Sequence, residues 1–411
     1  MHQHSGDTVK RILFVDDEPS VLDGLRTRLH RLQTKWSMSF VESGSLALEK
    51  MTERPYDVIV SDMRMPGMDG AKLLETVSGR WPETIRIVLS GYAELQQIIR
   101  LVPFAHQYLS KPCQPQQLEN TIDRCLLLHD LLNKPALRSL VGRIRALPTL
   151  PKIYTALQGI VRDESVTLAD VAKLVSADSA LAARVLQIVN SAFFRLARRI
   201  SSVEQAVSYL GFQAIRNLAM SVEVFSRWGG NNCSDVDLEK LQQHVHYVAA
   251  AANSLVARTP IADDTLLAGL LHDIGYWVMA QECPQDLSRA IKLAAAQQIP
   301  LYQAENEIMG ASHAEIGAYL LGIWGLPYPV VEAVAHHHQP ERVVQHELDV
   351  LGAVVIGHSL AVTDDSSAFA GAVTPERGIE PQYLIDLKTP FTWEDAVQRV
   401  AATTSPEEVE A

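Results

Sequence analysis

The first part of this chain alternates short apolar runs with helical patterns, and this alternation is its strongest constraint on fold. Five runs have the composition of buried strands, and apolar residues at helical spacing follow them. Successive strands joined by helices form parallel sheets, which are covered on both faces. We therefore predict a five-stranded parallel α/β sheet. Its strands are expected at residues 11–15, 38–41, 57–61, 86–89 and 106–109, and its helices near 21–29, 45–51 and 94–101, after Asp69 and from 116.

Polar residues follow four of the predicted strands. Asp16 and Asp17 follow the first strand, Asp62 the third, Ser90 the fourth and Lys111 the fifth. Functional groups gather at the carboxyl ends of such strands. Three carboxylates in one place repel one another, and a bound Mg²⁺ would relieve that repulsion. One carboxylate could then attack a phosphoryl group whose charge the metal and the lysine neutralise. Strand-end capping alone is a weaker explanation than a phosphoryl-transfer site for five polar residues at one edge of the sheet.

At these residues, segment 10–128 resembles the flavodoxin-like receiver domains of two-component response regulators. The loop at 63–70 (MRMPGMDG) and the Lys111-Pro112 pair belong to the same resemblance. It implies that Asp62 is the phosphoacceptor and that a sensor histidine kinase is the phosphodonor. It also implies roles for the other site residues. Mg²⁺ is held by Asp17, Asp62 and the Arg64 backbone oxygen, with help from Asp16. Ser90 contacts the phosphoryl group, and Tyr108 is the aromatic switch.

Residues 116–141 have the pattern of a long helix that Pro135 interrupts. We take 129–139 as a helical linker. Such a helix could carry a change from the receiver to the second domain, or pair with its own copy in a homodimer. A plain covered linker explains the pattern equally well.

From residue 147 onward the pattern is almost purely helical. Thr167 is an expected N-cap, Gly211 an expected C-cap, and Ser312 with Glu315 an expected capping box. The helices are expected at 153–163, 167–176, 179–191, 203–210, 213–228, 238–256, 265–279, 285–298, from Ser312 past Ile323, and at 327–338.

Histidines are unusually frequent in this helical half. A His272-Asp273 pair ends the apolar run of LLHDIGY (270–276), and further histidines are spread on both sides of it: His244, His246, His313, His336, His337, His338 and His358. Imidazoles and a carboxylate gathered in one domain would form a metal site that activates water. Taken singly, each histidine fits a surface or cap position as well.

Segment 140–342 resembles the HDOD domain, an all-helical relative of the HD phosphohydrolases. The resemblance rests on LPTLP (147–151) and five more matches in order: 176–194, 200–211, LLHDIG (270–275), 312–327 and HHQP (337–340). It implies a signalling module without catalysis that acts through contacts with a downstream protein. The implied metal positions are His246 (with His244 as the alternative), His272, Asp273, His313, His337, His338 and His358.

Three departures from the catalytic relatives bear on activity. Tyr276 replaces the lysine usual after HDIG, the GYP signature is missing, and His358 occupies the position of a late aspartate. Loss of a carboxylate weakens binding of a hard metal, so we expect no hydrolysis. The alternative is a receiver-controlled, metal-dependent phosphohydrolase, for example a cyclic dinucleotide phosphodiesterase.

Composition limits the classes of partner that we expect for this protein. The formal net charge of −12 argues against DNA binding, although Arg195, Arg198 and Arg199 could form a small basic patch. The four cysteines form no CxxC pair, the start is polar, and we find no apolar run long enough to cross a membrane. We therefore expect a cytoplasmic protein with a disordered segment at 1–9. Residues 343–411 are expected to form a C-terminal extension, with helices at 348–361, 381–387 and 393–401 and an acidic tail.

Overall fold

The computed structural model of the chain describes residues 9–90, 103–131, 135–142, 144, 147–149, 166–190, 199–211, 225–227, 235–361, 368–369 and 381–403. Two compact units emerge from the contacts, the first made mainly of residues 1–145 and the second of most of the remainder. The expected helices at 94–101 and 153–163, Arg195, Arg198 and the acidic tail lie outside the described residues.

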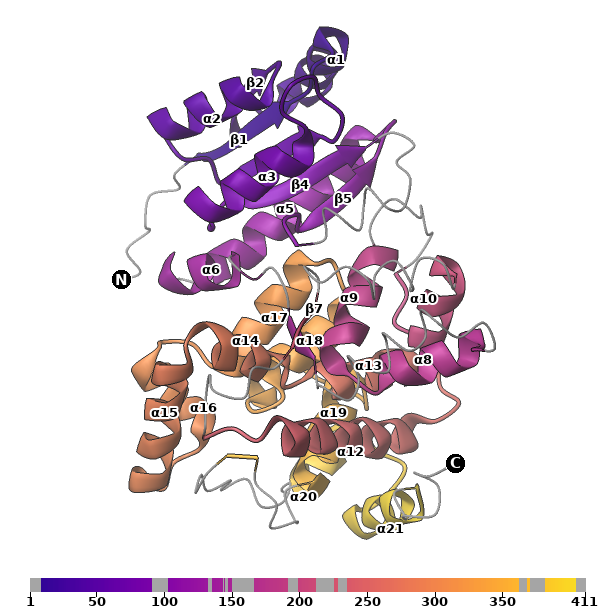
Figure 1. The fold of residues 1–411 in the computed structure, drawn as a ribbon. Coiled ribbons are helices and arrows are strands. Elements are labelled where there is room, and N and C mark those ends of the chain that lie inside the picture. The colour runs from indigo at the N-terminus through magenta and orange to yellow at the C-terminus, as the bar shows by residue number, and fades with distance from the viewer. Residues whose placement is uncertain are drawn as a thin grey trace. The chain divides into compact units, whose positions relative to one another are not determined.

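The first unit contains the predicted sheet. All five strands are parallel, in the order β2-β1-β3-β4-β5, and Figure 1 shows them as one twisted layer. Their bounds are β1 Lys10–Val15, β2 Trp36–Val41, β3 Val58–Asp62, β4 Ile85–Ser90 and β5 Gln107–Ser110. The described helices are α1 Pro19–Leu29, α2 Gly44–Glu53, α3 Gly70–Arg80 and α5 Pro115–Leu131, with a 3₁₀ turn η1 at His30–Leu32. The predicted α/β fold is confirmed.

Two hydrophobic cores lie on the two faces of this sheet. Successive side chains of a strand point to opposite faces, so the apolar strands fill both. Leu13 and Ile59 join α2 and α3 in one core, which includes Ala47 and Leu73. The neighbouring residues Ile12, Phe14 and Val58 join α1 and α5 in the other core, with Leu22, Leu29, Leu118 and Ile122. The sheet is thereby covered on both sides, as its apolar strands require.

Helix α6 (Pro135–Gly142) also belongs to the first unit, and a buried arginine attaches it. Arg86 on β4 is 1% exposed, and its guanidinium donates to Gly142 O (2.8 Å), Thr84 O (3.0 Å) and Pro82 O (3.2 Å). A guanidinium carries five N–H donors, so it can join several carbonyls at once. The contact boundary at 145 therefore lies beyond the expected linker at 129–139.

The second unit is a set of packed helices. Most of the predicted helices are present, and the Thr167 and Ser312 capping boxes and the Gly211 C-cap are all formed. The helices are α8 Leu168–Ser176, α9 Ser179–Val189, α10 Val203–Leu210, α12 Leu238–Val256, α13 Ala262–Leu271, α14 Ile274–Glu282, α15 Pro284–Gln297, α16 Leu301–Ile308, α17 His313–Ile323, α18 Tyr328–His336, η3 Pro340–Arg342, α19 Val350–Ala361, α20 Pro381–Asp386 and α21 Trp393–Thr403.

A small parallel ladder departs from the predicted helical pattern. Strand β6 (Leu147–Thr149) pairs with β7 (Phe225–Arg227), so the helix predicted over 213–228 was wrong at its end. The residue before a proline is biased away from helical geometry, and LPTLP places one proline inside β6 and another just beyond it. No comparable sequence signal marks residues 225–227, because this segment is a strand only through its pairing with β6.

The single helix predicted over 265–279 was also wrong. It is two helices, α13 and α14, with the His272-Asp273 pair at the break, where Asp273 has φ −100° and ψ 10°. A glycine allows α14 to start there: a Cβ on Gly275 would lie 2.0 Å from the carbonyl oxygen of His313. The first turns of α14 and α17 thus pack closer than any larger residue permits.

Candidate functional sites: an aspartate–lysine edge and a histidine cluster

One ammonium joins two carboxylates at the carboxyl edge of the sheet. Lys111 Nζ lies 2.6 Å from Asp16 Oδ2 and 2.7 Å from Asp62 Oδ1. The other oxygen of Asp62 accepts from the Arg64 N–H (3.0 Å), and Asp16 Oδ1 accepts from the Glu18 N–H (3.1 Å). Asp16 and Asp62 are 1% and 8% exposed, so their charges are held by partners rather than by bulk water.

Lys111 remains a cation in this setting. Burial lowers the pKa of its ammonium, but the hydrogen bonds and charges of Asp16 and Asp62 outweigh burial and raise the pKa above its ordinary value. The lysine therefore supplies a fixed positive charge beside Asp62 at neutral pH.

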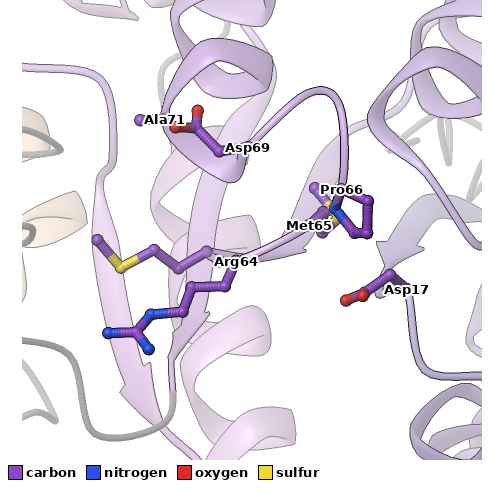
Figure 2. A pocket seen from close by; sticks show the side chains of 7 residues that line it. Asp17, Arg64, Met65, Pro66, Asp69 and Ala71 are labelled. Atoms are coloured by element: carbon purple, nitrogen blue, oxygen red, sulfur yellow. The ribbon is translucent and has the colours of Figure 1, made fainter.

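Asp17 stands apart from this ion pair and borders a pocket of about 480 Å³. Figure 2 shows its carboxylate pointing into that space from the loop after β1, across from the Arg64–Pro66 loop. Gly67 has a φ of +78°, which helps this loop to turn. Asp17, Asp62 and the Arg64 carbonyl thus offer oxygen ligands of the kind that Mg²⁺ prefers.

The remaining residues of the predicted receiver site come from β4 and β5. Ser90 is the last residue of β4 and pairs with Ser110, while its side chain lies outside the described residues. Tyr108 on β5 is 3% exposed and belongs to the α2–α3 core. Lys111 follows β5 and precedes a cis Pro112.

The second unit gathers most of its predicted histidines at one place. Within each of two groups of possible ligands, the donor atoms lie within 4.8 Å of one another. Together, the two groups take side chains from α12, α17 and α19 and from the residues that directly follow α13 and α18. The first group is Asp273, His313, His337 and His338; the second is His244, His272 and His358.

Hydrogen bonds from Nδ1 fix the orientation of three of these imidazoles. The Nδ1–H of His272 donates to Gly269 O (2.7 Å), that of His337 to Val334 O (2.9 Å), and that of His313 to Glu305 Oε2 (2.8 Å). The Nε2 of His272 and the Nε2 of His337 then each carry a lone pair. The Nε2 atoms of His272 and His337 are buried without a hydrogen-bond partner. Buried, unpartnered lone pairs directed to one place are what a metal ion would satisfy.

Asp273 lies between the two groups, with one oxygen toward each. Its Oδ1 is 3.4 Å from His313 Nε2 and 3.7 Å from His337 Nε2. Its Oδ2 is 3.4 Å from His272 Nε2 and 3.7 Å from His244 Nε2. A carboxylate in this position could be shared by two ions. The donor set therefore fits divalent metal in chemistry, burial and tautomer.

His244, rather than His246, reaches this cluster. The two residues are separated by about 200° around α12, at 100° per residue. His246 Nε2 lies 3.0 Å from Gln242 Nε2 and belongs to neither group. The packing of α12 against α13 places His244 toward Asp273, and a Cβ on Gly269 of α13 would come within 2.5 Å of Ala249 Cα.

The histidines of the cluster differ in the direction of their pKa shifts. Burial lowers the pKa of His244 to about 4, and it lowers the pKa values of His337, His338 and His358 well below their ordinary value, so these imidazoles are neutral. For His313, burial is outweighed by Glu305 and Asp273, which raise its pKa to about 10. Burial raises the pKa of Asp273, but its histidine neighbours prevail and keep that carboxyl ionised.

Glu305 is a site residue that sequence reasoning missed. Its side chain is fully buried, and Oε2 accepts from both the backbone N–H and the Nδ1–H of His313. It lies on α16, which was not predicted. The available signal was its position on the apolar face of that helix beside Leu301 and Ala304. Two tyrosines stack on the cluster: Tyr276 on His313, with ring centroids 4.0 Å apart, and Tyr302 on His338, at 4.9 Å.

Comparison with known families supports both predicted domains. Residues 12–123 match the response regulator receiver domain, the class that the aspartate–lysine edge defines. Residues 147–340 match the HDOD domain. The chain therefore contains a response regulator receiver domain followed by an HDOD domain. No helix in the described part of the chain is both long and apolar enough to cross a membrane.

Individual relatives cover parts of the chain. An uncharacterized protein of Treponema pallidum (strain Nichols) is 30% identical over 49% of this chain and 39% of its own length. The hydrogenase transcriptional regulatory protein HoxA of Cupriavidus necator is 38% identical over 28% of this chain and 24% of its own length. The chain thus spans less than two thirds of either relative. The MmoQ response regulator structure from Methylococcus capsulatus (strain Bath) has a TM-score of 0.48 and 23% identity, over 62% of this chain and 98% of that one.

Proposed function

We propose that Asp62 accepts a phosphoryl group from a sensor histidine kinase and that the HDOD domain passes the change to a downstream protein through contacts, without catalysis. The observation that carries the first step is the Lys111 ammonium, which joins Asp62 to Asp16 at the sheet edge. The Lys111 ammonium and the Arg64 N–H fix the orientation of the Asp62 carboxylate, as a nucleophile requires.

The chemistry follows from these groups. An Asp62 carboxylate oxygen attacks the phosphorus of the phosphohistidine while the bond to the imidazole nitrogen breaks, and the imidazole leaves with that electron pair. Lys111 and the Arg64 N–H lie beside the carboxylate and offset developing negative charge. Mg²⁺ bound by Asp17, Asp62 and the Arg64 carbonyl would neutralise the phosphoryl oxygens.

Labelling with acetyl phosphate tests this step. Wild type should incorporate one acid-labile, base-labile acyl phosphate in the presence of Mg²⁺, and Asp62→Asn should incorporate none. Asp69→Asn is the matched control, because Asp69 borders the same pocket but caps α3 by accepting from the Lys72 N–H. Undiminished labelling of Asp62→Asn would refute the acceptor assignment.

A second candidate function rests on the histidine cluster. The shared position of Asp273 between two histidine groups is the observation that favours a metal-dependent phosphohydrolase as the output. In that case, the metal would activate water, and Asp273 with the neutral imidazoles would hold it.

Metal content and cyclic dinucleotide turnover separate the two outputs. Metal in the wild type together with turnover that His272→Ala abolishes would make the HDOD domain an enzyme. Absence of turnover by a metal-loaded protein, with Asp62 phosphorylated or not, would support the contact-based output. The kinase, the downstream partner, a homodimer and the cytoplasmic location stay predictions.

A further inference from the structure

We infer that the histidine cluster selects late first-row transition ions such as Fe²⁺, Co²⁺ or Zn²⁺ over Mg²⁺ and Mn²⁺, and that His358 sets this selectivity. The inference rests on the proposed metal centre and specifies its chemistry. It begins with the donor count: six imidazoles and one carboxylate make up the two groups.

Nitrogen donors dominate each group. The first offers three imidazoles and an oxygen of Asp273, while the second offers three imidazoles and has only the other Asp273 oxygen within reach. Imidazole suits Fe²⁺, Co²⁺ and Zn²⁺, whereas Mg²⁺ and Mn²⁺ prefer carboxylate, carbonyl and water oxygens. Three nitrogens and one oxygen also match the common fourfold coordination of zinc.

Buried surroundings limit what else could supply oxygen. His272 and His313 are fully buried, and Asp273 is 3% exposed. Glu305 belongs to neither group, and its Oε2 accepts two hydrogen bonds from His313. Among the described residues of the two groups, no other carboxylate is present.

His358 is the position at which this balance can be changed. It is 7% exposed on α19, and its ring centroid lies 5.2 Å from that of His244 and 5.4 Å from that of His272. A carboxylate there would give the second group its own oxygen ligand and a second negative charge. His358 therefore determines both the proportion of nitrogen to oxygen donors in the second group and the charge of that group.

The test is metal competition on the full chain. Wild type and variants, each in an Asp17→Asn/Asp62→Asn background that removes the receiver ligands, are stripped with chelator. They are then loaded from an equimolar mixture of Mg²⁺, Mn²⁺, Co²⁺ and Zn²⁺ and desalted. Metal content is measured by plasma mass spectrometry, and the absorption bands of Co²⁺-loaded protein report nitrogen coordination.

Wild type should retain Zn²⁺ and Co²⁺ in large excess over Mn²⁺ and Mg²⁺. His358→Asp should shift the retained metal toward Mn²⁺ and weaken the Co²⁺ bands, and His358→Ala should lose metal from one group without that shift. His336→Asp is the matched control, because His336 belongs to neither group, and it should leave the distribution unchanged.

Three results would overturn the inference. A wild-type preference for Mn²⁺ or Mg²⁺, or an unchanged distribution in a folded His358→Asp, rejects the selectivity while leaving a metal centre. Absence of bound metal rejects the centre itself, and acetyl phosphate labelling of the chain with its native receiver ligands then still decides the receiver step. If His358→Asp does not fold, the wild-type competition alone decides the selectivity.

Discussion

The two sites of this chain differ in which partners their clustered polar groups have. At the sheet edge, the carboxylates of Asp16 and Asp62 already have a counter-charge in Lys111. In the helical unit, buried imidazole nitrogens of His272 and His337 have no hydrogen-bond partner, and one carboxylate serves both groups. In the first site, Asp16 and Asp62 therefore have a counter-charge from the protein itself, whereas we propose that a bound ion satisfies the lone pairs of the second site.

The two sites also differ in their exposure to solvent. In the receiver, Asp17 and Asp69 border a pocket beside the loop that follows Asp62, and we propose that a phosphodonor approaches there. The histidine cluster is buried except at His244 and His338, one half-buried member in each group. A site of the first kind suits rapid transfer from a large partner, and one of the second kind suits a retained ion.

The largest expected effect comes from Asp273→Asn. Because its two oxygens face the two groups, the substitution should remove metal from both, and with it the stabilisation by bound ion of about 2.7 kcal/mol at a hundredfold excess over Kd. Metal content and the metal-dependent shift in Tm measure this, with exposed Asp286→Asn as control. Metal retained in both groups would show that Asp273 is not shared.

Lys111→Met tests the claim that the receiver site carries its own counter-charge. Loss of the ammonium leaves Asp16 and Asp62 to repel each other and removes a donor beside the acceptor, so phosphoryl incorporation should slow about a hundredfold. The rate of labelling from acetyl phosphate measures this. Lys72→Met, on the exposed face of α3, should label at the wild-type rate. An equal rate in Lys111→Met would contradict the assigned role.

Glu305→Gln tests the positioning of His313. The amide keeps the size of the side chain but weakens the hydrogen bond that orients the imidazole, so metal affinity should fall about 10- to 100-fold. Competition with a chromophoric chelator gives the affinity, and the exposed neighbour Glu307→Gln is the control. A change equal to that control would reduce Glu305 to a structural role.

Gly275→Ala tests the close approach of α14 and α17. The added methyl would meet the His313 carbonyl at 2.0 Å, so the helical unit should lose about 1.5 kcal/mol of unfolding free energy. Gly24→Ala is the counterpart in α1, where a Cβ meets nothing within 4 Å, and it should stabilise the receiver by about 0.5 to 1 kcal/mol. Urea denaturation followed by circular dichroism separates the two signs.

The receiver could be predicted almost entirely from sequence. Its strands are short, apolar and regularly spaced, and parallel strands bring their carboxyl ends to one edge whatever the details of packing. Asp16, Asp62 and Lys111 therefore had to meet once the sheet existed.

The histidine cluster shows where local pattern stops being sufficient. The sequence identified most of its ligands, but His244 and His246 lie on nearly opposite sides of one helix, and only the packing of α12 decides which faces Asp273. At the helix break at His272-Asp273, α14 starts in close contact with α17, which local sequence does not reveal. Glu305 comes from a helix of only eight residues, and its burial beside His313 follows from tertiary packing. Sequence thus determined the chemistry that is present, and long-range helix packing decided which side chains share it.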